Sequence, residues 1–170
     1  MSELPEEVKA WIGQEKYREE GEFDVERGYI FTSCSSVENG NPIFWDEKVA
    51  DEITGGCIAP PTMISVWFRP HQWSPGRSEP AVPLQTHFDL KKALDLPEAV
   101  MTDNTIVFYE PVRVGDRLHT YQVIRSISAP KTTKLGTGSF WELDVEYENQ
   151  NGVKVATESY TGFGYKREKK

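Results

Sequence analysis

Polar residues lie beside prolines in two short stretches of the N-terminal half, a combination typical of binding and catalytic loops. Residues 39–46 read Asn-Gly-Asn-Pro-Ile-Phe-Trp-Asp, and residues 55–62 read Gly-Gly-Cys-Ile-Ala-Pro-Pro-Thr. The amides of Asn39 and Asn41 can position a substrate, but an amide cannot take up a proton at neutral pH. An acid–base reaction at these stretches would therefore need a carboxylate or a histidine.

Two carboxylates flank the first stretch and are candidates for a general base. Glu38 precedes Asn39, and Asp46 ends the stretch. Asp46 is also suited to cap a helix that begins after it, because Asp is favoured at the N-cap. No histidine lies near Glu38 in the sequence, so a relocated histidine would be His87, which follows a proline-rich segment.

The histidines and cysteines do not follow the spacing of a metal site. His71, His87 and His119 share no ligand spacing with one another or with Cys34 and Cys57, so we expect no metal. The two cysteines form neither a CxxC motif nor a disulfide framework, which is typical of a reducing cytoplasm.

The charge balance excludes several classes of partner. The chain has 170 residues, with 19 Lys and Arg against 27 Asp and Glu, for a net charge of -8. Nucleic acids and acidic membranes attract basic surfaces, so we expect neither as a partner. No apolar run has the length of a membrane span, and the acidic N-terminus lacks the features of a signal peptide. These features predict a cytoplasmic, single-domain protein.

The N-terminal half carries mainly helical patterns. Apolar residues at helical spacing predict helices at 6–19, 26–36 and 46–53, and a brief alternation predicts a strand at 23–25. Residues 57–69 are apolar nearly all round and contain prolines at their start, which predicts a buried helix.

The C-terminal half carries strand patterns instead, with β-branched and aromatic residues in alternation. The predicted strands are 105–109, 119–124, 139–147 and 153–164. Asn-Gln-Asn-Gly at 149–152 predicts a hairpin between the last two. The proline-rich segment 70–83 predicts a long surface loop or lid. Helices followed by an antiparallel meander indicate an α+β domain whose sheet curls around the apolar helix.

Three motifs in order resemble those of MaoC-like (R)-specific enoyl-CoA hydratases. Residues 39–46 are similar to the family strip G-D-x-N-P-x-H-x-D, and 108–116, Phe-Tyr-Glu-Pro-Val-Arg-Val-Gly-Asp, to its F-x-x-P-V-x-x-G-D turn. Residues 55–62 resemble the G-x-x-A-P-P-T form of the FAS1-like dehydratase N-terminal half. The resemblance covers 23–165 and implies a hot-dog fold, a curled antiparallel sheet around a central buried helix. Residues 1–22 would then form a helical extension and 166–170 a basic tail.

The resemblance implies a reaction that this chain lacks the groups to perform. The family hydrates a trans-2-enoyl thioester, or dehydrates the 3-hydroxyacyl product, with an Asp and a His five residues apart. A backbone N–H near the helix start polarises the thioester carbonyl. Carried over by motif, the Asp falls on Asn39, the His on Phe44 and the N–H donor on Pro60. These positions carry an amide, a phenyl ring and a proline nitrogen without a hydrogen, and none of the three can perform the family's role there.

Such a pattern resembles the non-catalytic subunits of two-component hydratases of lipid or steroid metabolism. The resemblance then implies a heterodimer in which a second hot-dog subunit supplies the catalytic groups. This chain would shape a tunnel for a long or bulky acyl group. The expected ligand is an acyl-CoA or acyl carrier protein thioester, without another cofactor. The expected substrate-binding residues are Asn41, Trp45, Thr62, Ser65 and Trp67.

Four aromatic residues are expected to gather around the acyl tunnel. They are Trp45, Trp67, Phe68 and Trp73. Aromatic side chains are more often plain core than a ligand platform, but flat apolar walls suit a long or polycyclic acyl group.

Two further functions stay open at this point. The chain could be an independently active hot-dog hydratase or thioesterase with catalytic groups relocated to Glu38, Asp46 or His87. It could also be an acyl-CoA-binding module without catalysis. Turnover by the isolated chain distinguishes the first from a non-catalytic subunit, and ligand binding without turnover in any complex indicates the second.

Overall fold

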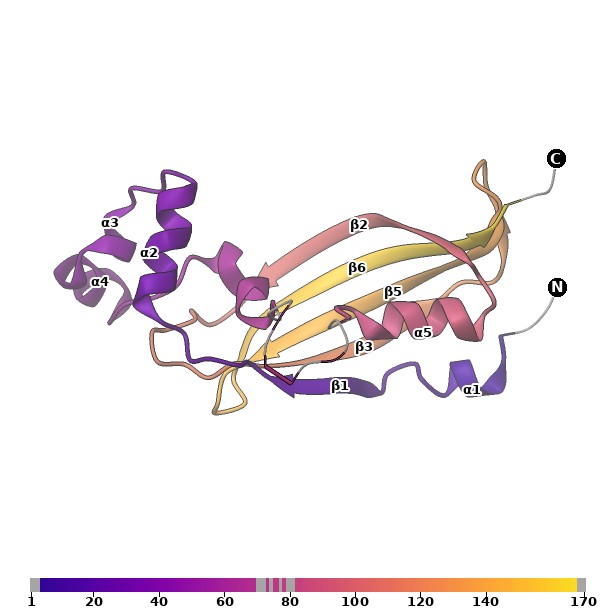
Figure 1. Cartoon of the computed structure of the whole chain (residues 1–170), viewed down its shortest axis with the longest axis horizontal. Helices are drawn as coiled ribbons and strands as arrows, with labels where there is room; N and C mark the ends of the chain where they lie inside the picture. Colours follow the sequence, from indigo (N-terminus) through magenta and orange to yellow (C-terminus); the bar gives the residue numbers. More distant parts are fainter. Residues whose placement is uncertain (1–3, 70–72, 74, 77, 79–81, 168–170) are drawn as a thin grey trace.

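A curled antiparallel sheet forms the body of the molecule (Figure 1). The computed structural model describes residues 4–69, 73, 75–76, 78 and 82–167. The sheet order is β1-β3-β5-β6-β2, with β4 beside β5. The strands are β1 (Glu15–Glu20), β2 (Glu98–Phe108), β3 (His119–Ile127), β4 (Lys131–Thr132), β5 (Thr137–Glu148) and β6 (Lys154–Lys166).

All four strands predicted in the C-terminal half are present, and the longest pair forms the predicted hairpin. The amide of Gly152 donates to the carbonyl of Asn149 over 2.9 Å, and Gly152 takes the positive φ of 72° that this turn requires. Alternation along β5 directs every second side chain to the inner, concave face of the sheet. Those side chains are Trp141, Leu143, Val145 and Tyr147, and all are buried.

Two short helices cover the inner face, one behind the other along the sheet. The 3-10 helix η1 (Pro61–Phe68) buries Met63, Ile64 and Trp67 against one end. The α-helix α5 (Gln85–Ala93) buries Leu90 against the other end, beside Trp141. The predicted α+β fold, in which the sheet curls around a buried helix, is therefore confirmed. The buried helix predicted at 57–69 is shorter than expected, and the sequence patterns gave no indication of α5.

The inner face is closely packed where Trp141 crosses β6. A Cβ added to Gly162 would lie 2.4 Å from the indole Nε1 of Trp141, and one added to Gly164 would lie 2.4 Å from its ring carbon Cη2. Real Cβ atoms do not approach so closely, so β6 needs glycine at both positions. The indole thus lies directly over the β6 backbone.

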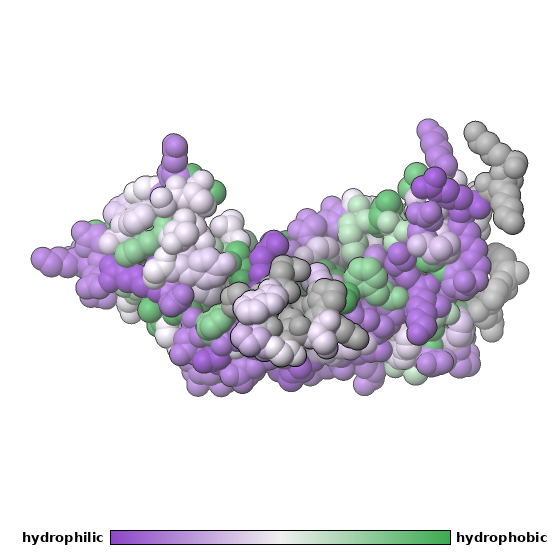
Figure 2. All heavy atoms as spheres, in the orientation of Figure 1, coloured by the Kyte–Doolittle hydropathy of each residue, from purple (hydrophilic) through white to green (hydrophobic). Residues whose placement is uncertain are grey.

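A helical lobe projects from one end of the sheet and is set off from the body by a notch (Figures 1 and 2). It consists of α2 (Arg27–Ser36), α3 (Pro42–Trp45) and α4 (Glu47–Thr54). Two of these helices were predicted. Asp46 caps α4, as expected, by accepting hydrogen bonds from the amides of Lys48 and Val49.

The predictions for the first 25 residues were wrong. Residues 6–19 form one short helix, α1 (Glu6–Lys9), followed by the edge strand β1, and do not form a continuous helix. Gly13 takes a positive φ of 78° between them, and this breaks the helix. The segment 23–25 is not a strand, because the backbone of Val25 pairs with the turn at Gly115 and Asp116 instead.

Some expectations cannot be compared with the fold. His71, most of the loop 70–83 and the last three residues of the basic tail lie outside the described residues. Within the described parts of the chain, no helix is both long and apolar enough to cross a membrane.

Candidate functional site

A cavity of about 530 Å³ lies over the sheet, between the end of η1 and the start of α5. The end of η1 contributes Ser65 and Phe68, the segment before α5 contributes Pro83 and Leu84, and the sheet forms the floor. We call this space the sheet cavity. Its remaining lining residues are Glu19, Arg69, Thr120, Gln122, Val145, Tyr147, Glu158 and Tyr160.

A buried carboxylate is the most polar feature of this cavity. Glu158, on β6, is only 6% exposed. Its Oε2 accepts a hydrogen bond from the Tyr147 hydroxyl at 3.1 Å, and its Oε1 accepts one from Asn104 Nδ2 at 3.1 Å. Tyr160 lines the same cavity, and its pKa is raised in part by the nearby Glu158. We call Glu158, Tyr147, Asn104 and Tyr160 the Glu158 cluster.

Burial and the neighbouring carboxylate keep both phenols of the cluster protonated. Burial is the larger cause of the raised pKa of Tyr147, and the negative charge of Glu158 raises that pKa further. The pKa of Tyr160 is raised by burial and by the nearby Glu158, against the opposing charge of Arg69. Both phenols therefore stay protonated, and Tyr147 donates its hydrogen to Glu158.

A second buried glutamate, on the outer face of the sheet, provides a comparison. Glu146 is 2% exposed and forms ion pairs with Arg125 and Lys154. Within the part of the chain that the structure describes, the hydrogen-bond donors to Glu158 are neutral, and Arg69 lines the same cavity without forming an ion pair with Glu158. A buried carboxylate is usually compensated by a direct ion pair, so Glu158 is the less ordinary of the two.

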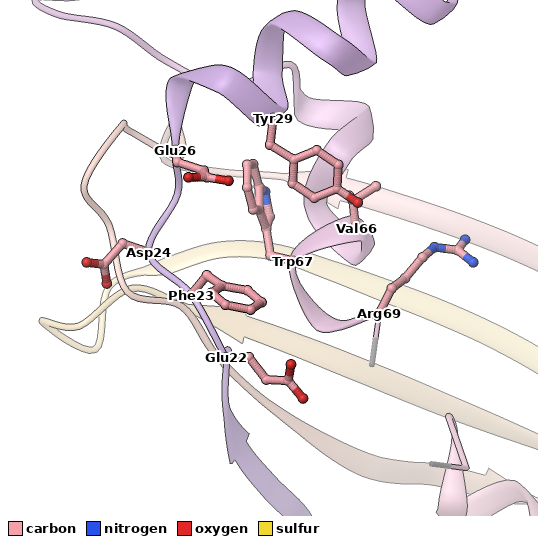
Figure 3. Close-up of a pocket in the computed structure, with 8 residues that line it drawn as sticks. All are labelled: Glu22, Phe23, Asp24, Glu26, Tyr29, Val66, Trp67 and Arg69. Atoms are coloured by element: carbon pink, nitrogen blue, oxygen red, sulfur yellow. The ribbon is translucent and has the colours of Figure 1, made fainter. Parts of the chain in front are cut away.

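A smaller pocket of about 290 Å³ lies between η1 and the segment before α2 (Figure 3). Phe23, Tyr29 and Trp67 form its aromatic walls, and the rings of Tyr29 and Trp67 meet edge to face at 5.5 Å. The rim carries the carboxylates of Glu22, Asp24 and Glu26. Arg69 borders this aromatic pocket and also the sheet cavity.

The first motif, which resembled a catalytic strip, forms a hydrogen-bonded turn in the helical lobe. Asn39 Oδ1 accepts from the amide of Asn41 at 3.2 Å, and the carbonyl of Asn39 accepts from Trp45 Nε1 at 2.7 Å. Asn41 in turn caps α3 through the amide of Ile43 at 3.2 Å. Trp45 stacks on Phe31 with ring centroids 4.8 Å apart. The polar groups of this strip are thus committed to local structure.

Phe44 and Pro60, the other two positions at which the resemblance places catalytic groups, also have structural roles. We call these positions and Asn39 the vacated positions. Phe44 packs against the hydrophobic core beneath the lobe. Pro60 is buried, and its carbonyl accepts the Met63 amide that starts η1, at 2.9 Å. The neighbouring amide of Ala59 is bonded to the carbonyl of Val112 at 2.8 Å. Neither Pro60 nor Ala59 therefore offers a free N–H to a thioester carbonyl.

The five expected substrate-binding residues do not come together at one place. Ser65 lines the sheet cavity and Trp67 lines the aromatic pocket. Thr62 is exposed on η1, whereas Asn41 and Trp45 lie in the helical lobe. Their roles in binding stay predictions.

The expected aromatic cluster is divided among several places. Phe68 packs on Tyr147 in the sheet cavity, with ring centroids 5.5 Å apart. Trp67 lies in the aromatic pocket, Trp45 stacks on Phe31, and Trp73 is 78% exposed. Only Phe68 thus contacts the floor of the sheet cavity.

The candidates for relocated catalysis lie outside the lining of both cavities. Glu38 is exposed beside the strip, and Asp46 is engaged as the cap of α4. His87 is buried on α5, with its ring 5.3 Å from that of Trp141. Burial, aided by the charge of Lys91, lowers the pKa of His87, so the ring is neutral at neutral pH.

Metal-ligating side chains do not converge within the described ranges. No group of three His, Cys, Asp or Glu there is placed to hold a metal ion. Cys34 is buried and Cys57 half-buried, and both are free thiols.

Residues 10–158 match the model of a family described as the FAS1-like, dehydratase domain region. The chain belongs to the FAS1-like dehydratase family. The match includes both motif stretches and most of the sheet, so it agrees with the resemblance seen in the sequence.

Similar proteins support the same assignment. A probable enoyl-CoA hydratase alpha subunit from Thermomonospora curvata is 28% identical over 159 residues. This alignment covers 90% of the present chain and 49% of the relative, so the chain spans about half the length of that curated relative.

Solved structures confirm the hot-dog fold of this member of the FAS1-like dehydratase family. The ChsH1-ChsH2 complex from Mycobacterium tuberculosis contains a chain with a TM-score of 0.77 and 20% identity, covering 96% of the present chain and 90% of that one. The HadBC (3R-hydroxyacyl-ACP dehydratase) complex, also from Mycobacterium tuberculosis, gives a TM-score of 0.57 at 20% identity, covering 87% and 95%. At these identities the likeness establishes the fold.

Sequence reasoning missed the Glu158 cluster, although a signal was present. Ala156, Glu158 and Tyr160 share one face of β6, and that face packs inward. A glutamate at an inward position of an alternating strand is a candidate functional residue even without a motif around it.

Proposed function

We propose that this chain is the non-catalytic half of an enoyl-thioester hydratase or 3-hydroxyacyl-thioester dehydratase. In this proposal the sheet cavity holds the acyl group of a CoA or acyl carrier protein thioester. A second hot-dog subunit supplies the acid–base pair and the donor to the thioester carbonyl. The reaction would belong to cytoplasmic lipid or steroid metabolism and would need no cofactor besides the thioester substrate.

The observation that carries this proposal is the state of the three vacated positions. Hydration across a double bond needs a base for water and an acid for the α-carbon. The Asn39 amide is bonded within its own turn, Phe44 belongs to the core, and Pro60 has no N–H. Restoring the chemistry would require three separate changes in three different structural roles.

The cavity supports a part in substrate binding. A volume of about 530 Å³ lies within the usual range for small-molecule sites, and its walls combine apolar side chains with a few polar ones. An acyl group of more than a few carbons can be accommodated in this space. The T. curvata relative is described as an enoyl-CoA hydratase subunit, which agrees with an acyl thioester as ligand.

The free edge of β2 supports a partner subunit. β2 pairs only with β6 in the sheet order, so its other edge carries unpaired backbone groups. Met101, Val107, Phe108 and Tyr109, on or just after this strand, are all more than 40% exposed. A long apolar edge strand is a template for pairing with another sheet. The ChsH1-ChsH2 and HadBC structures are themselves complexes of hot-dog proteins.

Substitutions on each side of the complex test the proposal. The chain is co-purified with its hot-dog partner. Hydration of enoyl-CoA is measured as the decrease in absorbance of the conjugated thioester. We expect Glu38→Gln and His87→Gln in this chain to leave kcat within about twofold, because neither side chain reaches the reacting atoms. Replacing the partner's own acid–base pair should abolish turnover. Loss of turnover by the first two variants, with retention by the partner variant, would overturn the proposal.

A further inference from the structure

We propose that the Glu158 cluster binds a hydroxyl group carried on the acyl chain, away from the thioester end of the ligand. This inference rests on the proposed function, because it assumes that the sheet cavity holds an acyl group. It adds the class of acyl group: one that bears a hydroxyl donor.

The cluster presents hydrogen-bond acceptors to the cavity. A carboxylate has about four acceptor sites, and the described donors to Glu158 come from Tyr147 and Asn104. Tyr147 has given its only hydrogen to Glu158, and its oxygen can still accept. A ligand hydroxyl, which can donate, fits this arrangement better than a ketone, which can only accept.

The cluster lies apart from the positions at which the resemblance places catalytic groups. Glu158, Tyr147 and Tyr160 all line the sheet cavity. Asn39, Phe44 and Pro60 are not among its lining residues. We therefore place the bound hydroxyl on the acyl chain and not at the thioester end.

Energetics favour a functional reason for a carboxylate at this place. A buried carboxylate without a direct ion pair is less favourable than an apolar side chain of similar volume. Glu146, on the opposite face, has ion pairs with Arg125 and Lys154, whereas the described hydrogen-bond donors to Glu158 are the neutral groups of Tyr147 and Asn104. An acyl group without a hydroxyl would displace water from Glu158 and return no hydrogen bond, so it should bind less tightly.

Matched pairs of ligands test this inference on the intact complex with its partner subunit. The probes are octanoyl-, dodecanoyl- and hexadecanoyl-CoA, each compared with the CoA thioester that carries a hydroxyl on the terminal carbon. Dissociation constants are measured by calorimetry. We expect the hydroxylated member of at least one pair to bind about tenfold tighter or more, the factor given by one hydrogen bond to a charged group.

Variants assign the preference to the cluster. Glu158→Gln should reduce the preference to near parity, and Tyr160→Phe, which keeps the ring, should weaken it. Tyr121→Phe is the matched control, because Tyr121 also donates to a glutamate, Glu148 at 3.2 Å, but from the outer face of the sheet. The preference should persist in this control. Circular dichroism confirms that each variant is folded. If Glu158→Gln does not fold, Tyr160→Phe alone tests whether the preference for the hydroxylated ligand depends on the Glu158 cluster.

The possible results separate the two proposals. Equal dissociation constants within every pair, or a preference that survives in Glu158→Gln and in Tyr160→Phe, would overturn the hydroxyl inference and leave the proposed function standing. If no member of any pair binds, the proposed function is overturned and the inference with it.

Discussion

The hydroxyl of Tyr147 on β5 donates to the carboxylate of Glu158 on β6 over 3.1 Å, inside the sheet cavity. Its chain neighbour Glu146 points to the other face and pairs with cations there. Neighbouring residues of β5 thus face two different glutamate environments. Glu146 itself forms ion pairs on the outer face, whereas Tyr147 donates a neutral hydrogen bond to Glu158 on the inner face. This alternation lets the same hairpin carry a structural ion-pair network outside and a polar ligand site inside.

Removing the Tyr147 hydroxyl should destabilise the protein through the buried acceptor that it leaves. We expect Tyr147→Phe to lower the free energy of unfolding by about 1–3 kcal/mol, the cost of an unsatisfied buried polar group. Urea unfolding followed by circular dichroism measures this difference. Tyr121→Phe serves as control and should cost less, because its partner Glu148 is only partly buried. Equal decreases in the free energy of unfolding of the two variants would contradict the claim that the acceptor of Tyr147 is the more deeply buried one.

His87 should make the protein less stable in mild acid. Burial lowers its folded-state pKa below the usual 6.5, whereas the unfolded chain titrates near that value. The unfolded state therefore binds the extra proton first, and stability present above pH 6.5 is lost as the pH falls toward the folded pKa. In His87→Phe, which retains a ring against Trp141, the loss between about pH 7 and pH 5 should be smaller.

A comparison of unfolding curves at several pH values checks this prediction. His119→Gln is the control, because His119 is half-exposed on β3 and not enclosed under α5. An identical acid dependence in the wild type and His87→Phe would show that His87 does not resist protonation.

The approach of Trp141 to β6 predicts a strong effect of a single methyl group. Gly164→Ala places a Cβ 2.4 Å from the indole ring and should destabilise by about 1–3 kcal/mol, as overpacked cores do. Gly28→Ala on α2 meets nothing within 4 Å and should be neutral or stabilising, because alanine favours helix. Thermal unfolding of the two variants distinguishes these outcomes, and a neutral Gly164→Ala would show that Trp141 moves freely.

Charges on the free edge of β2 should prevent assembly without unfolding the subunit. Met101→Lys combined with Val107→Lys replaces two exposed apolar residues that we assign to the partner interface. Gel filtration with the partner should then show separate subunits. Val37→Lys, at a still more exposed apolar position on the helical lobe, should assemble as the wild type does. If the double variant still assembles, another surface must form the interface.

The sequence predicted the sheet well, because its strands carry regular alternation and its hairpin carries Asn-Gly. It failed at β1, Glu15–Glu20, where five charged residues in six follow no alternating pattern. Charged residues suit an edge strand exposed to water, so the property that keeps β1 from aggregating also hides it from a hydrophobic pattern. The helix α5 was missed for another reason: only Thr86, His87 and Leu90 on it are buried, which is too few for a clear periodicity.

The site residues named from the motifs stay predictions. Asn39 bonds within its own turn, Phe44 packs against the core, and Pro60 has no N–H to donate. The motifs could not locate the Glu158 cluster, because its members come from three strands and share no sequence motif. The register of β2, β5 and β6 alone brings Asn104, Tyr147 and Glu158 together.

The most direct measurement is the hydration of a trans-2-enoyl-CoA by the purified chain alone, compared with the same chain in complex with its hot-dog partner. The proposed function predicts no turnover above buffer for the isolated chain and rapid turnover for the complex. Turnover by the isolated chain that disappears in Glu38→Gln or His87→Ala would contradict it, because this chain would then contain its own catalytic groups.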